Sequence, residues 1–83
     1  MNKILVEIML PAAEQTWDVL LPPDSKLTDI TKLLVKMFSD LADGKYKPVQ
    51  INLLCDGETG HMLDMNRSPA ELGIRNGDRL LLI

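Results

Sequence analysis

The 83-residue sequence contains few of the residues on which small proteins build covalent or metal-based chemistry. It has one cysteine, Cys55, and one histidine, His61. A single cysteine cannot form an internal disulfide, and the two residues together fall short of the four ligands of a structural zinc site. A small domain without disulfides fits a reducing compartment. We therefore expect a cytoplasmic protein that holds no metal.

Long runs of charge and of apolar residues are also missing. Nine basic and twelve acidic residues are scattered along the chain and give a net charge of −3, so no basic stripe is available to bind nucleic acid. No apolar run approaches the roughly 18 to 20 residues that a membrane-spanning helix needs. The N-terminal segment 1–13 has the features of a signal peptide, but Glu7 lies in its centre and argues against export. These observations exclude nucleic acid and direct membrane insertion.

The few reactive side chains have no partners in the sequence that would make them catalytic. His61 has no evident nucleophile or orienting carboxylate, and a single thiol at the end of an apolar strand, such as Cys55, is typical of a small buried hydrophobe. The segment 56–60 has the spacing of neither a phosphate loop nor a calcium loop. The sequence therefore predicts no catalytic, cofactor-binding or metal-binding residue, and no enzyme activity.

What the sequence does contain is a regular order of strand and helix signals. A hydrophobic fraction of 46% and a charged fraction of 25% are ordinary for one globular domain, here residues 1–83. Alternation, turn residues and a 3.6-residue apolar period predict strands at 3–10, 16–21, 49–55, 61–63 and 80–83, a helix at about Lys26–Leu41, and a helical turn at 68–73. Asp24 and Ser25 are candidate N-caps of the helix, and Ser68 of the helical turn.

The apolar residues of the helix recur at steps of three and four residues, which places them on one side of the helix. They are Leu27, Ile30, Leu33, Leu34, Met37, Phe38 and Leu41.

Alternation along the strands predicts an excess of apolar side chains on the face of the sheet that points away from the helix. If Val6 and Ile8 face the helix, their neighbours face the other way, and the same reasoning applies to the later strands. Such a patch is typical of an interaction surface. The predicted protein-binding patch consists of Leu5, Met9, Leu54, Leu81 and Ile83. The alternative is a register shifted by one residue, which would place some of these side chains in the core.

The order of the elements is that of the β-grasp, and the segment 72–80, Leu-Gly-Ile-Arg-Asn-Gly-Asp-Arg-Leu, is similar to the sequence before the last strand of ubiquitin-like domains. The chain resembles the ubiquitin-like β-grasp proteins, which implies an α+β fold with a mixed sheet of four to five strands covered on one face by a single helix. It has no Gly-Gly after Ile83. Among non-conjugating members it is most similar to the YukD/EsaB group. This resemblance implies a cytoplasmic accessory or assembly component of a bacterial type VII secretion system, with secretion-machinery proteins as partners.

Three alternatives stay open at the level of sequence. The fold would equally suit an adaptor or regulator of an unrelated protein complex, because function resides in surfaces and not in the scaffold. A sulfur carrier or protein modifier would need a C-terminal Gly-Gly that is absent from these residues. An apolar sheet face would also allow a homodimer.

Overall fold

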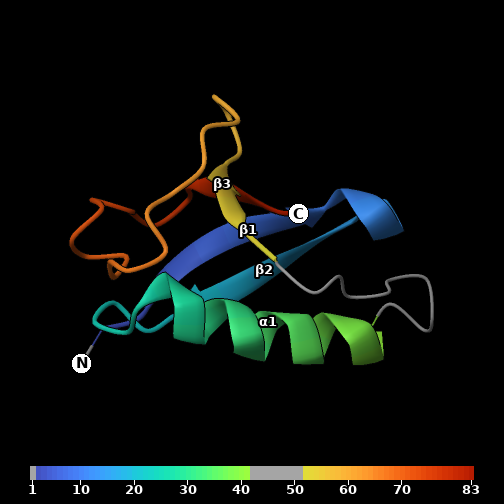
Figure 1. Cartoon of the computed structure of the whole chain (residues 1–83), viewed down its shortest axis with the longest axis horizontal. Helices are drawn as coiled ribbons and strands as arrows, with labels where there is room; N and C mark the ends of the chain where they lie inside the picture. Colours follow the sequence, from blue (N-terminus) through green and yellow to red (C-terminus); the bar gives the residue numbers. More distant parts are fainter. Residues whose placement is uncertain (1, 42–51) are drawn as a thin grey trace.

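The computed structural model describes residues 2–41 and 52–83 and shows a mixed four-stranded sheet with one helix against one face (Figure 1). The strands lie in the order β2-β1-β4-β3, with β1 antiparallel to β2 and parallel to β4. The predicted strand residues 49–51 fall outside the described part of the chain. The elements are β1 (Ile4–Leu10), a 3₁₀ turn (Pro11–Ala13), β2 (Gln15–Leu21), α1 (Leu27–Leu41), β3 (Leu54–Asp56) and β4 (Arg79–Leu82).

The two central strands, β1 and β4, supply the middle of the core through strict alternation. Val6 and Ile8 of β1 and Leu80 and Leu82 of β4 are at most 3% exposed, so the predicted inward set of both strands is confirmed. Burying an aliphatic side chain of this size contributes about 1.5 to 3 kcal/mol. These two strands therefore form the centre of the domain, against which α1 packs.

The helix begins at Leu27, one residue later than predicted, and its described part extends to Leu41. Its buried side is narrower than the apolar period indicated. Ile30, Leu34 and Phe38 are buried, but Leu33 is 68% exposed, and Met37 and Leu41 are also exposed. The prediction that the seven apolar residues lie on one side of α1 holds, but these three remain exposed on that side, which the sequence did not show.

The orientation of the third strand differs from the prediction. Leu54 is 0% exposed and lies opposite Leu82, which faces the core, so Leu54 also faces the helix and not solvent. Adjacent residues Leu54 and Cys55 are both buried, which hides the alternation that would have fixed the register. The predicted edge strand at 61–63 is reduced to a single bridge between Cys55 and Met62.

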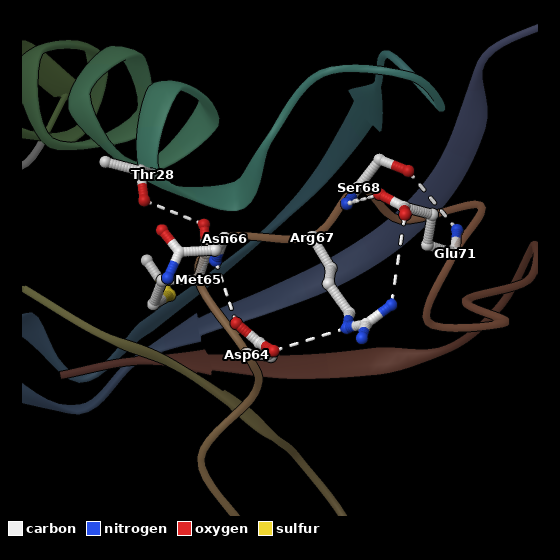
Figure 2. A network of polar contacts seen from close by, with 7 residues as sticks. All are labelled: Thr28, Asp64, Met65, Asn66, Arg67, Ser68 and Glu71. Atoms are coloured by element: carbon white, nitrogen blue, oxygen red, sulfur yellow. Dashed lines mark hydrogen bonds and ion pairs between the residues drawn. The ribbon is translucent and has the colours of Figure 1, made fainter.

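The N-terminus of α1 is held by a segment far along the chain. Leu27 and Thr28 donate their backbone N–H groups to the carbonyl oxygens of Arg67 and Met65, both at 2.9 Å, and the Thr28 hydroxyl donates to Met65 at 2.7 Å (Figure 2). The first N–H groups of a helix have no partner within the helix and must find one elsewhere. Among the described residues no side-chain bond from Asp24 or Ser25 reaches them, so the predicted N-cap is replaced by these carbonyl groups.

The predicted turn at 68–73 is present, and Ser68 and Glu71 cap each other at its start. Glu71 donates its backbone N–H to the Ser68 hydroxyl at 3.2 Å, and Ser68 donates its own N–H to the Glu71 carboxylate at 3.0 Å, as Figure 2 shows. The bond from the Ser68 backbone lowers the pKa of the Glu71 carboxyl, which favours the charged acceptor. Gly73 then adopts a positive φ of 71° and ends the turn, which leads the chain into β4.

Two threonines of α1 are expected to respond in opposite directions to the same substitution. Thr31 is 5% exposed and its hydroxyl has no hydrogen-bond partner, so Thr31→Val should raise the free energy of unfolding by about 1 kcal/mol. Thr28→Val removes the 2.7 Å bond to Met65 and should lower it by about 1 kcal/mol. Urea unfolding measures both. Equal and opposite shifts of the midpoint are expected, and a destabilised Thr31→Val protein would contradict the prediction.

Candidate docking surface

The sheet face that points away from α1 carries an apolar patch along one row of the strands. Met9, Leu81 and Cys55 lie in register across β1, β4 and β3, and Cys55 also bridges to Met62. Met9 is 44% exposed and Met62 68%, whereas Leu81 is half-buried between its neighbours. Ile83, two residues beyond Leu81 on the same face, is 53% exposed. We call Met9, Met62, Leu81 and Ile83 the outer patch.

Leu5 lies on the same face but apart from the outer patch. It pairs with Leu20 of β2, and the two are 44% and 58% exposed. Glu7 and Arg79 occupy the row between, and the Glu7 carboxylate lies 3.3 Å from the Arg79 guanidinium. The outer face therefore presents two apolar areas separated by an ion pair, where the sequence predicted one continuous patch.

Of the five predicted patch residues, the structure places four on the outer face. Leu5, Met9, Leu81 and Ile83 point away from α1, as alternation predicted, but Leu54 does not belong to this face because it is buried against the helix.

Leu20 and Met62 were missed by the sequence reasoning. Leu20 could have been found from its place in the alternation of β2, since it lies between Val19 and the buried Leu21. Met62 could not have been found in that way, because only the bridge to Cys55 brings it to the sheet.

The potentially reactive residues Cys55, Asp56 and His61 are either part of the packing and turns of the fold or exposed. Cys55 is 2% exposed, as expected of a small buried hydrophobe. The side chain of Asp56 accepts the backbone N–H groups of Glu58 and Thr59 at 2.7 and 3.1 Å, and these bonds lower the pKa of its carboxyl. The Asp56 carboxylate thus shapes the turn, and exposed His61 follows that turn. Within residues 2–41 and 52–83, no group of three His, Cys, Asp or Glu side chains is placed to hold a metal ion.

A cavity of about 450 Å³ lies on the flank of α1 that faces β3. It is lined by Thr28, Thr31, Lys32, Val35, Asn52, Leu53 and Met65.

Among the described helices, none has the length and hydropathy to cross a membrane.

One helix packed on a mixed sheet of order β2-β1-β4-β3 defines a ubiquitin-like β-grasp domain, and the solved structures agree. The ubiquitin-like domain of EccD5 from Mycobacterium xenopi matches with a TM-score of 0.81 at 25% identity, covering 100% of this chain and 94% of that one. The ubiquitin-like domain of the type VII secretion protein EccD1 of Mycobacterium tuberculosis matches with a TM-score of 0.80 at 16% identity, covering 100% and 99%.

A chain of the MycP5-free ESX-5 inner membrane complex also matches, with a TM-score of 0.80 at 24% identity, and the match covers 100% of this chain and 21% of that one. The family model described as protein YukD of the WXG100 protein secretion system matches residues 4–82, and the chain belongs to this family. It is thus a ubiquitin-like domain associated with type VII secretion. No curated protein sequence gives a significant match.

Proposed function

We propose that this protein is a cytoplasmic accessory or assembly component of a type VII secretion system, which binds other components of the machinery without catalysis. The observation that carries the proposal is the family match over residues 4–82. The similar domain found in a chain of the ESX-5 inner membrane complex supports protein partners within such a machine.

The binding surface we propose is the outer face, with the outer patch as its centre. Met9 and Ile83 expose 44% and 53% of their surface, which folding of this chain does not remove from water. Burying apolar area of this kind against a partner is worth about 25 cal/mol per Å². The adjoining Glu7–Arg79 ion pair adds polar groups that can fix the orientation of the partner.

The experiment is a chromosomal exchange in the organism that encodes the protein. A Met9→Asp/Ile83→Asp double variant should reduce secreted WXG100 protein in the culture medium to near the level of a gene deletion, because two charges would enter an apolar interface. Ala70→Asp, a change at an exposed position near the turn that contacts α1, serves as the matched control and should secrete normally.

Circular dichroism of the purified variants must show the native fold, and immunoblots must show equal cellular amounts. Normal secretion by the double variant would refute the outer patch as the binding surface. Normal secretion by the gene deletion would refute the role in secretion itself.

A further inference from the structure

β2 has a hydrogen-bonding edge that no other strand of the described residues covers. It is the outermost strand in the order β2-β1-β4-β3, and all seven of its residues pair with β1 on the other side. A free edge of this length can pair with a strand of another chain, and proteins either obstruct such edges or use them. The side chains around the edge indicate which of the two applies here.

The register identifies the backbone groups that point to this edge. Glu7 donates its N–H to Asp78 and Leu5 accepts the N–H of Gly77, so at both residues the backbone groups of β1 are directed towards β4. In an antiparallel pair, the residue opposite such a position directs its own groups the other way. Asp18 lies opposite Glu7 and Leu20 opposite Leu5. The N–H and C=O groups of Thr16, Asp18 and Leu20 therefore face outward from the free edge.

Apolar surface continues from this edge onto the helix. Trp17 and Val19, on the inner face of β2, are only half-buried. The flank of α1 that carries Thr28 and Lys32 faces β3, so the opposite flank, with Leu33 and Met37, lies on the β2 side. Leu33 is 68% exposed and Met37 39%. An added strand would bring its inward side chains against this surface.

The charged side chains near the edge indicate which kind of partner strand would bind there. Asp18 lies directly opposite Glu7, a like-charged pair that destabilises a sheet, and Glu7 is already paired with Arg79. Asp18 has no ion pair among the described residues. On α1, the exposed residues Asp29 and Asp40 share the side of Leu33 with exposed Lys36, so the helix adds little net charge there and Asp18 decides the sign at the edge. A basic side chain would neutralise the Asp18 carboxylate, whereas a second copy of this chain, with its net charge of −3, would bring further negative charge.

We propose that the free edge of β2 binds an extended, basic segment of a partner protein, which joins the sheet as an additional strand. Its alternate apolar side chains lie over Trp17 and Val19 and contact Leu33 and Met37. Its lysine or arginine side chains lie on the outer face beside Asp18. Backbone hydrogen bonds supply affinity in this mode of recognition, and the alternating side chains supply specificity.

A synthetic peptide tests the proposal directly. The probe is a blocked nine-residue peptide in which valines alternate with lysines and threonines, and the control peptide carries glutamate in place of each lysine. Titration of ¹⁵N-labelled protein, followed by NMR and amide hydrogen exchange, should show protection of the Thr16, Asp18 and Leu20 amides by the lysine peptide. The glutamate peptide should bind at least roughly tenfold more weakly.

Two pairs of variants separate charge from apolar contact. Asp18→Lys should weaken binding of the lysine peptide roughly tenfold, and Asp18→Asn should weaken it less. Leu33→Glu should also weaken binding, whereas His61→Glu, at an exposed residue beside β3 on the far edge of the sheet, should bind as the native protein does. Because all three positions are exposed, the fold should survive each change, and thermal unfolding checks this.

Three results would overturn the proposal. The first is no shift of the edge amides at peptide concentrations up to about 1 mM. The second is equal binding of the lysine and glutamate peptides. The third is protection of the edge amides in the free protein that rises with protein concentration, since a second copy would then occupy the edge.

Discussion

Replacing Leu54 with aspartate is expected to abolish the folded state. Leu54 is 0% exposed and faces Leu82 across the β3–β4 pair. Loss of the leucine side chain alone costs about 2 to 5 kcal/mol, and an unpaired buried carboxylate adds several more. A domain of 83 residues has a total stability of only about 4 to 12 kcal/mol. Far-ultraviolet circular dichroism and NMR shift dispersion should both report an unfolded chain.

The matched control is Ile83→Asp, which places the same charge one residue beyond the end of the adjacent strand. Ile83 is 53% exposed, so its carboxylate would remain hydrated and the protein should unfold at nearly the native urea concentration. A folded Leu54→Asp protein would mean that this side chain faces solvent. The register of β3 described above would then be wrong.

Phe38→Ala is expected to remove a large part of the stability without changing the surface. Phe38 is fully buried and stacks on Trp17 with 4.7 Å between the ring centroids, which ties the last turns of α1 to β2. Truncation of a buried phenylalanine costs about 3 to 5 kcal/mol. Trp17 is the only tryptophan in the sequence, so its fluorescence should report both the lost contact and a lower urea midpoint.

Met37→Ala provides the comparison for Phe38→Ala. Met37 precedes Phe38 on the same helix turn but is 39% exposed, so its truncation should lower stability by less than about 1.5 kcal/mol. Similar losses from the two variants would contradict the assignment of Phe38 to the core and of Met37 to the surface.

The central strands could be predicted from sequence because their side chains alternate between the core and the outer face. Val6 and Ile8 alternate with Leu5, Glu7 and Met9, and the polar Glu7 settles which set is buried. Of the capping pair Ser68 and Glu71, only Ser68 was predicted, because a serine before a proline indicates the start of a helical turn.

The third strand and the helix flank could not be predicted in this way. At residues 53–55 three apolar residues follow one another, so alternation gives no orientation, and Leu54 was placed on the wrong face. Along α1, Leu33 and Leu34 look alike in sequence, but one is 68% exposed and the other 3%. The helical turn points these adjacent residues in directions about 100° apart, and the strand that would have to cover Leu33 is not given by the helix sequence.

The candidate docking surface could also be predicted only in part. Leu5, Met9, Leu81 and Ile83 follow from strand alternation alone, and the structure places them on the outer face. The gap between Leu5 and the rest follows from the cross-strand register, which sets Glu7 beside Arg79. Sequence gives the direction of a side chain on its own strand, but not the neighbour it meets on the next.

The parallel pairing of β1 with β4 has a consequence for how the protein is made. Ile8 pairs with Leu80, so the centre of the sheet joins segments separated by about seventy residues, and such distant pairings form late in folding. During synthesis the β1–β2 hairpin and α1 leave the ribosome well before β4. Until β4 arrives, the β1 edge that it covers and the apolar side chains of the future core remain open, and a chaperone or an early partner has its best opportunity to engage the nascent chain.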